Sequence, residues 1–318
     1  MEYPAFSEIK KLRDKQIKET VHDHFKLNRL HEEIIKQVVS SAINHLTKQI
    51  GPPPSPFSFF AMGSAGRLEQ SIWSDQDHGI IYQNQRDETK IYFLTLGKVI
   101  SHYLHEAGYE YCDGGVMASS PLWCKSLPEW QEQLINWITE SSWESIRHLL
   151  IFIDGRTIFG EHTYIHQLKS MIYDMVKKEN LLPRILNNTL HVKKGIGILG
   201  QFLIETHGSY IGSINLKEIA FFPYVNAVRL LAIKEQLQET STLSRLTQLQ
   251  FQDKDRYKEQ FLKLLKYRLT FGNHTDYESG HFLPIATLSK QQKNELKDII
   301  KNGIRLLQMS KKLAGKED

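Results

Sequence analysis

Apolar residues recur at every third or fourth position from residue 21 to residue 50. This spacing is typical of an amphipathic helix that buries one side. The helix is predicted to end at Gly51, because three prolines follow that glycine. The next apolar run, PFSFFAMG, predicts a short buried strand. It leads into a small-residue turn over residues 63–66, a short helix over 67–72 and a second strand, HGIIY.

Between these strands and residue 160, the same patterns predict a mixture of helices and strands. The expected elements are a helix over 91–107 with Gly108 as its C-terminal cap, a strand-like stretch over 109–112, a helix over 129–140, a helix that begins at Ser141 or Ser142, and a buried strand, LLIFID, over 149–154.

The pattern changes after Gly160, because nearly every later segment has a period of 3.6 residues. The expected helices cover 162–178, 181–206, 223–239, 254–271 and 289–313. The glycines between 195 and 200 fall inside one of them, and we interpret them as positions of close helix packing. We therefore predict three parts: an N-terminal helical segment (1–50), an α+β domain (51–160) and a helical C-terminal domain (161–318).

Composition narrows the class of protein further. The 318 residues are 41% hydrophobic and 24% charged, as in a folded protein, and the net charge of +4 is too small to argue for wrapping nucleic acid. Two cysteines cannot build a four-ligand zinc site or a disulfide scaffold, so we interpret Cys112 and Cys124 as small apolar packing residues in a reducing compartment. The first residues resemble no signal peptide and no run is long enough to span a membrane, so a cytoplasmic location is expected.

The most informative stretch runs from Gly63 to Asp77. A Gly-Ser turn between a strand and a helix lets backbone amides approach a phosphate closely, although a purely structural turn has the same pattern. Asp75 and Asp77 are one residue apart at the edge of a strand and are expected to share a face. Two adjacent carboxylates suit Mg²⁺, which takes its other ligands from phosphates and water. The alternative is that Ser74-Asp75 caps a turn and Asp77 is solvated.

The order strand, Gly-Ser turn, helix, Asp-x-Asp resembles the nucleotidyltransferases of the DNA polymerase β superfamily. More narrowly, GSAGRLEQSIWSDQDHGIIY is similar to the motif of bacterial PII-protein uridylyltransferases and glutamine synthetase adenylyltransferases. The resemblance is closest to a bacterial nucleotidyltransferase family with a helical C-terminal domain. It covers most of the chain from about residue 20 and includes YEYCDGGVMA, IDGR and Ile214-Asn215-Leu216-Lys217, where Asn215 stands in place of an expected aspartate.

The resemblance implies an α+β fold with a mixed sheet flanked by helices, and it assigns site residues. Asp75, Asp77 and Asp154 would be catalytic and hold Mg²⁺, as two ions, with Mn²⁺ as the other candidate metal. Gly63, Ser64, Gly66, Arg67 and Lys217 would bind the nucleotide. The alternatives are a surface turn at Asp154, a salt bridge for Arg67 and a helix cap for Ser64. Lys217 would contact the triphosphate or an acidic acceptor, whereas Arg229 and Arg245 could equally lie on solvated helix faces.

The predicted reaction is attack of an acceptor hydroxyl on the α-phosphorus of a nucleoside triphosphate, with release of pyrophosphate. By resemblance, UMP or AMP would be transferred to a regulatory protein in signal transduction. The competing hypothesis is a nucleotide-binding regulator that has lost turnover. Addition of nucleotides to RNA or DNA would require a basic groove, which the net charge does not indicate. A membrane partner is not expected.

Overall fold

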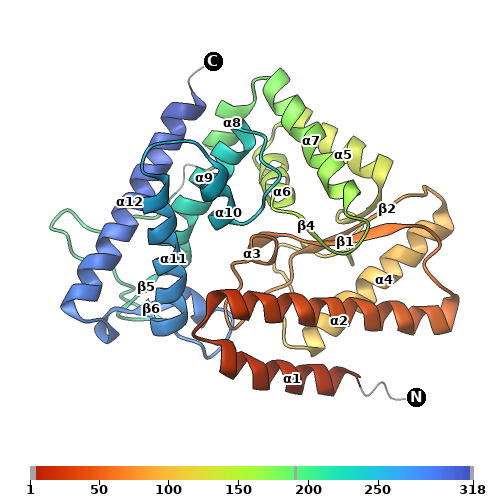
Figure 1. The fold of residues 1–318 in the computed structure, drawn as a ribbon, viewed down its shortest axis with the longest axis horizontal. Helices are drawn as coiled ribbons and strands as arrows, with labels where there is room; N and C mark the ends of the chain where they lie inside the picture. The colour runs from red at the N-terminus through yellow and green to blue at the C-terminus, as the bar shows by residue number, and fades with distance from the viewer. Residues whose placement is uncertain (1–4, 190–191, 316–318) are drawn as a thin grey trace. The chain divides into compact units, whose positions relative to one another are not determined.

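The computed structural model describes residues 5–189 and 192–315, and the chain divides into two compact units (Figure 1). The first unit comprises Met1–Ile172 and the second Tyr173–Asp318. The protein is a mixed α+β structure, as the sequence predicts. None of the helices in the described residues combines the length and the apolarity that a membrane span requires.

A four-stranded mixed sheet forms the centre of the first unit. Its strands are β1 (Phe57–Ala61), β2 (His78–Tyr82), β3 (Cys124–Ser126) and β4 (Arg156–Gly160). Their order is β3-β2-β1-β4, with β1 antiparallel to both neighbours and β2 parallel to β3. Every residue of β1 and β2 is buried, which explains why apolar residues predominate in both strands. Both predictions of a strand are confirmed.

Helices cover both faces of this sheet. They are α1 (Ala5–Thr20), α2 (His24–Ile50), α3 (Gly63–Gly66), α4 (Asp87–Glu106), α5 (Leu127–Glu140), α6 (Trp143–Ile153) and α7 (Thr163–Lys178), which continues into the second unit. Figure 1 shows α2 and α4 on one side of the sheet and α5 and α6 on the other. The predictions of α2, α4 and α5 are confirmed within a few residues. Ser126 starts α5 with a capping box, and the predicted cap Ser142 starts α6.

Two local predictions in this unit are wrong. Residues 149–153 are the last turns of α6 rather than a strand, and Asp154 is its C-terminal cap. A short apolar run fits a buried helix end as well as a strand, and here the spacing of buried residues from Ile146 onward is helical. The short helix predicted over 67–72 lies earlier, at 63–66, because the chain turns at Leu68 with a φ of +57°.

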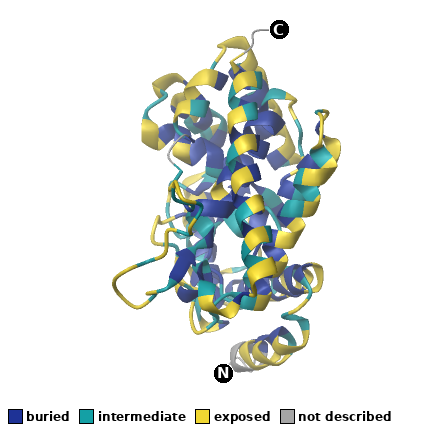
Figure 2. Ribbon diagram, turned by 90° about the vertical axis from the view of Figure 1, so that its left-hand side faces the viewer, coloured by how far each residue is buried: buried dark blue, intermediate teal, exposed yellow. Residues whose placement is uncertain are grey.

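The second unit is mainly helical and contains a small two-stranded antiparallel sheet. Its elements are α8 (Leu182–Asn187), β5 (Ser213–Asn215), the π-helix η1 (Lys217–Phe221), α9 (Phe222–Lys234), α10 (Thr242–Gln248), α11 (Lys254–Phe271), the 3₁₀-helix η2 (Ser279–His281), β6 (Phe282–Pro284), the 3₁₀-helix η3 (Ile285–Thr287) and α12 (Lys290–Ala314). The long helices carry their exposed residues on one side (Figure 2), which leaves an apolar side for the core.

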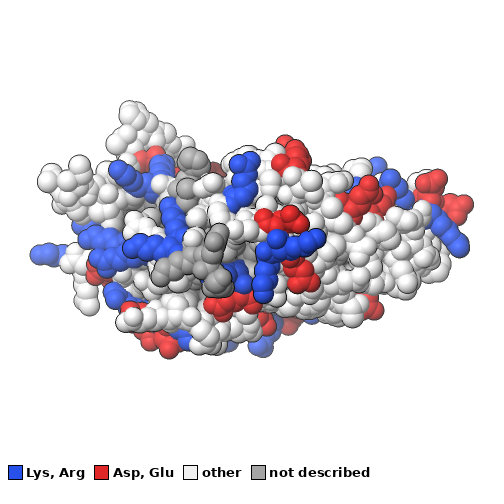
Figure 3. Space-filling model, turned by 90° about the horizontal axis from the view of Figure 1, so that it is seen from above, with Lys and Arg blue, Asp and Glu red and all other residues white. Residues whose placement is uncertain are grey.

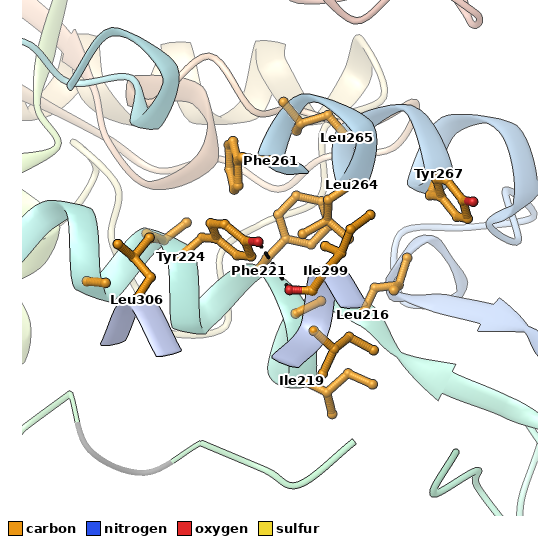
Figure 4. Close-up of a cluster of buried hydrophobic side chains, with 14 of the residues drawn as sticks. Leu216, Ile219, Phe221, Tyr224, Phe261, Leu264, Leu265, Tyr267, Ile299 and Leu306 are labelled. Atoms are coloured by element: carbon orange, nitrogen blue, oxygen red, sulfur yellow. Dashed lines mark hydrogen bonds between the residues drawn. The ribbon is translucent and has the colours of Figure 1, made fainter. Parts of the chain in front are cut away.

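The core of this unit lies between α9, α11 and α12 (Figure 4). At its centre the hydroxyl of Tyr224 donates a hydrogen bond to the carbonyl of Ile299 at 3.1 Å, while its ring packs against Phe261. This buried bond satisfies the only polar atom of the tyrosine side chain among apolar neighbours. The predicted helices at α9, α11 and α12 are confirmed.

The helix predicted over 181–206 is not observed. Only Leu182–Asn187 is helical, residues 190–191 lie outside the described residues, and 192–204 form an irregular segment closed by a bridge between Ile196 and Phe202. Three glycines disfavour a helix there, and Gly200 has a φ of +78°. The interpretation of these glycines as close helix packing is therefore wrong. The antiparallel pairing of β5 with β6 is not predicted either.

Candidate active site

Asp75, Asp77 and Cys112 come together at one end of strand β2. One ligand atom from each side chain lies within 4.8 Å of the other two, and all three residues are half-buried. The sequence predicts that the two aspartates lie on a shared face, and the structure brings them together. It adds Cys112, which the sequence interpretation assigned to apolar packing.

Backbone hydrogen bonds fix the segment that carries the two aspartates. The carbonyl of Asp77 accepts a hydrogen bond from the amide of Met62 at 2.7 Å, which ties the start of β2 to the end of β1. On the other side, Asp75 forms a parallel bridge with Glu110, through bonds of 3.0 and 3.1 Å. The segment therefore has a neighbour on each side, and Cys112 follows two residues after this bridge.

Gln76, which lies between the two aspartates, points into the protein. Its side-chain amide donates to the carbonyls of Ser101 and Tyr109 at 3.0 and 3.1 Å, and its Oε1 lies 3.2 Å from Nε2 of His78. Nδ1 of His78 accepts from the amide of Ala118 at 3.2 Å, so Nε2 carries the proton. Burial lowers the pKa of His78 to about 3, which keeps the ring neutral.

Helix α2 supports the same segment through His31. Nε2 of His31 lies 2.8 Å from the carbonyl of Ser71, which can only accept, so Nδ1 accepts from the hydroxyl of Tyr109 at 2.9 Å. Burial, with a further contribution from Arg13, lowers the pKa of His31 to about 3. A neutral histidine thus positions Tyr109, whose carbonyl in turn holds Gln76.

The Gly-Ser turn faces Asp77. Gly63 has a φ of +54°, and a Cβ atom on it would collide with the carboxylate of Asp77. In the same way, a Cβ on Gly66 would collide with the carbonyl of Asp154. Glycine is required at these two positions because the chain approaches its own acidic segments closely, a reason that sequence reasoning missed. Among the described residues, the amide of Ser64 donates no hydrogen bond.

Arg67 joins the turn to the end of α6. Its Nε donates to Glu69 at 2.8 Å and its Nη1 donates to Asp154 at 2.7 Å. The side chain of Asp154 is fully buried and that of Glu69 is 4% exposed. Burial alone would lower the pKa of Arg67, but the two carboxylates more than offset this effect and raise it. Nη2 of Arg67 has no partner in the described part of the chain.

Asp154 therefore lies elsewhere than the sequence prediction placed it. It caps a helix instead of ending a strand, and it does not belong to the group formed by Asp75, Asp77 and Cys112 within the described residues. Its assignment as the third metal ligand stays a prediction, and its ion pair with Arg67 favours a different role. The salt bridge considered as the alternative for Arg67 is present.

The donor set fits a hard divalent cation at the two carboxylates. Two carboxylates are the usual protein contribution to a magnesium site that also binds phosphates. Burial raises the pKa of Cys112 to about 12, helped by the negative charge of Asp77. Both effects favour the protonated thiol over a thiolate ligand. Cys124 is buried inside β3, as its predicted apolar role requires.

The basic residues singled out in the C-terminal half belong to the second unit. Lys217 is half-buried, with Nζ 3.3 Å from Nε2 of His281 and 5.8 Å from the ring centre of Tyr277. Arg229 and Arg245 are buried, so the alternative that they lie on solvated faces is wrong. Nε of Arg245 donates to the carbonyl of Glu239 at 2.8 Å, a bond within the unit that indicates a structural role.

Comparison with protein families gives matches over both units. Residues 8–144 match the family model described as "Putative nucleotidyltransferase DUF294". Residues 179–313 match the one described as "Putative nucleotidyltransferase substrate binding domain". No curated protein matches the chain.

Proposed function

Because the chain belongs to the nucleotidyltransferase family DUF294, we propose that it transfers UMP or AMP from a nucleoside triphosphate to a hydroxyl group of a regulatory protein. The observation that carries this proposal is the pairing of Asp75 and Asp77 opposite the Gly63 turn. The arrangement combines two carboxylates for a metal ion with backbone amides for a phosphate. The reaction class follows from the family, and the nucleotide and the acceptor follow from the sequence resemblance.

Asp75 and Asp77 would hold the divalent cation, Mg²⁺ or Mn²⁺, together with phosphate oxygens of the nucleotide. When bound, the metal neutralises charge on the triphosphate and orients the α-phosphorus for attack. The hydrogen-bonded Gln76 prevents the two aspartates from turning inward, so both carboxylates stay available on the same side. In this proposal two such ions bind, as the sequence resemblance implies.

Ser64 and Arg67 would bind the phosphates. The amide of Ser64 has no hydrogen-bond partner among the described residues. Nη2 of Arg67 likewise has none among them. In the proposed step, the acceptor oxygen forms a bond to the α-phosphorus while the bond to the bridging oxygen breaks. Pyrophosphate leaves with that electron pair, and the hydroxyl proton is lost to water. Positioning and charge neutralisation provide the rate enhancement.

One observation favours the second candidate function, a nucleotide-binding regulator without turnover. The third side chain in the group is the thiol of Cys112 and not a carboxylate. A protonated thiol adds no negative charge, so the site holds less charge for metal ions than three carboxylates would provide. The two functions share nucleotide binding and differ only in the release of pyrophosphate.

Transfer can be tested with the four α-labelled nucleoside triphosphates, Mg²⁺ and cell extract as the source of acceptor. We expect one labelled product with one nucleotide for the wild type, and a loss of several powers of ten for Asp77→Asn. Asp87→Asn, which removes an exposed carboxylate in the first turn of α4, should transfer like the wild type. Nucleotide binding without labelled product or pyrophosphate would support the regulator and contradict the transferase. In that case Cys112→Asp is the variant expected to restore turnover.

A further inference from the structure

A large groove crosses the surface of the second unit, between the irregular segment 192–203 and the C-terminal half of α12. Its volume is about 1090 Å³, and all of its lining residues belong to this unit. It lies within the region matched by the substrate-binding family model. The proposed chemistry at Asp75 and Asp77 does not use this groove.

The floor of the groove is an apolar stripe on α12. Ile300, Ile304 and Leu307 recur at helical spacing, so they share one face of the helix. The opposite wall carries Ile198 and Leu199, whose side chains are almost completely exposed. Exposed aliphatic side chains at the edge of an apolar groove are typical of a surface that binds another chain.

The rim of the groove is basic. Five cationic side chains line it, and no acidic residue does: Lys193, Lys194, Lys301, Arg305 and Lys311. Lys193 is neutralised by Glu205 and Glu218, at 2.9 and 3.2 Å. The other four form no ion pair with any described residue. Lys and Arg side chains also gather on the part of this unit visible in Figure 3.

The shape and the chemistry of the groove distinguish between three classes of partner: a nucleic acid, a lipid surface and a protein helix. From Ile300 to Lys311 the groove follows about 16 Å of α12, which is three helical turns. Among the described residues that line the groove none is aromatic, so these residues offer no platform on which nucleobases could stack. A flat lipid surface would not fill a concave groove. An apolar floor with a cationic rim matches a helix with aliphatic residues on one face and carboxylates beside it.

We propose that this groove binds an acidic amphipathic helix of the acceptor protein. The identification of the partner as the acceptor rests on the proposed function, whereas the docking chemistry rests on the groove alone. Docking there would recruit the acceptor through the second unit and leave the carboxylate site free for the nucleotide. Lys301 and Arg305 are exposed and lie on the same side of α12 as Ile304, so they would meet the carboxylates of the partner.

The test uses the full chain and a fluorescein-labelled designed helix of sixteen residues, with leucines on one face and glutamates beside them. Fluorescence anisotropy should show saturable binding. The double variant Lys301→Glu with Arg305→Glu should weaken it about tenfold, because each attraction becomes a repulsion. A matched double variant, Lys266→Glu with Lys290→Glu, makes the same charge change at exposed positions outside the groove and should bind like the wild type. Peptides with glutamine for glutamate, or serine for leucine, should bind weakly.

Several results would overturn the proposal. These are the absence of saturable peptide binding, an equal loss of peptide affinity in the two double variants, and equal binding of the peptides with leucine and with serine. Binding of oligouridylate or of anionic vesicles that the groove variant abolishes would assign the groove to a different partner. Concentration-dependent self-association that the groove variant removes would assign it to a second copy of this chain. Asp77→Asn should bind the peptide normally, so failure of docking and failure of nucleotidyl transfer are separate results. Far-UV circular dichroism checks that each variant is folded.

Discussion

Replacement of Arg67 by methionine should destabilise the first unit more than replacement of Asp154 by asparagine. Arg67 forms ion pairs with two buried carboxylates, those of Asp154 and Glu69. The Arg67→Met variant removes this guanidinium from both of them. Removing one partner of a buried ion pair costs about 3–5 kcal/mol, so we expect a loss at the upper end of that range. Asp154→Asn retains the pair with Glu69 and an amide oxygen that can accept from Nη1. Its expected loss is about 1.5–3 kcal/mol, the range of one charged hydrogen bond.

The measurement is urea denaturation followed by tryptophan fluorescence. All five tryptophans lie between residues 73 and 143, so their fluorescence reports on the first unit and not on the second. Lys26→Met is the control, because it removes an exposed ion pair of 3.7 Å and should leave the midpoint unchanged. The reasoning is refuted if Arg67→Met and Asp154→Asn cost the same, or if Arg67→Met costs less than about 1 kcal/mol.

The same pair of variants separates a supporting role from metal binding for Asp154. If Asp154 acts by holding Arg67, the folded Asp154→Asn protein should keep its nucleotide transfer within about tenfold of the wild type, a change in activation free energy of about 1.4 kcal/mol. A metal ligand would instead behave like Asp77, with a loss of several powers of ten. A loss of that size in folded Asp154→Asn would instead support Asp154 as a metal ligand.

Three further predictions concern other parts of the chain. Gly63→Ala should lower metal and nucleotide affinity by displacing Asp77. Gly115 has a similar positive φ but open space around it, so Gly115→Ala should lower only the stability. Calorimetric titration of metal and nucleotide distinguishes the two variants. The pKa of His31 is about 3 in the folded protein, so the unfolded chain takes up a proton first as the pH falls. The contribution of His31 to the free energy of unfolding is therefore present above about pH 6.5 and is lost at about 1.4 kcal/mol per pH unit down to about pH 3. Between pH 7 and pH 5, the urea midpoint should fall less in His31→Gln than in the wild type. Lys217→Ala should bind magnesium and nucleotide normally but transfer poorly at limiting acceptor, and unchanged transfer would remove Lys217 from the mechanism.

Features encoded within a few neighbouring residues were predictable from the sequence. Helix α2 has a continuous apolar stripe and a terminating Gly51. Strands β1 and β2 are short segments, mostly apolar, that lie between turn residues. Asp75 and Asp77 lie in the same extended segment, so their shared face follows from local backbone geometry. These predictions needed no knowledge of distant contacts.

Features that depend on contacts between distant segments were not predictable. Asp154 was expected at the end of a strand because residues 149–153 are all apolar, but the cap at Ser142 starts a helix that includes this run. Its partner Arg67 is 87 residues earlier in the chain, beyond the reach of any local pattern. The clash that makes Gly63 necessary arises with Asp77, across two strands.

The place of Cys112 beside the aspartates also depends on a nonlocal contact. The segment that carries it is joined to the aspartate segment by the bridge between Asp75 and Glu110. The resemblance of residues 109–118 to the family pattern was the available signal, but it gave no role for the thiol. Only the structure shows that the thiol of Cys112 lies beside the carboxylates of Asp75 and Asp77.

The claim that Asp75 and Asp77 form a metal site for a nucleotide is tested most directly by electron paramagnetic resonance of Mn²⁺. The wild-type protein, titrated with Mn²⁺ in the presence of a non-hydrolysable nucleoside triphosphate, should bind the ion and reduce the signal of free Mn²⁺ beyond what the nucleotide alone does. The variant with Asp75→Asn and Asp77→Asn should give the signal of nucleotide and Mn²⁺ without protein, because neutral amides are poorer ligands for a hard cation. Equal Mn²⁺ binding by the wild type and a folded double variant would contradict the account.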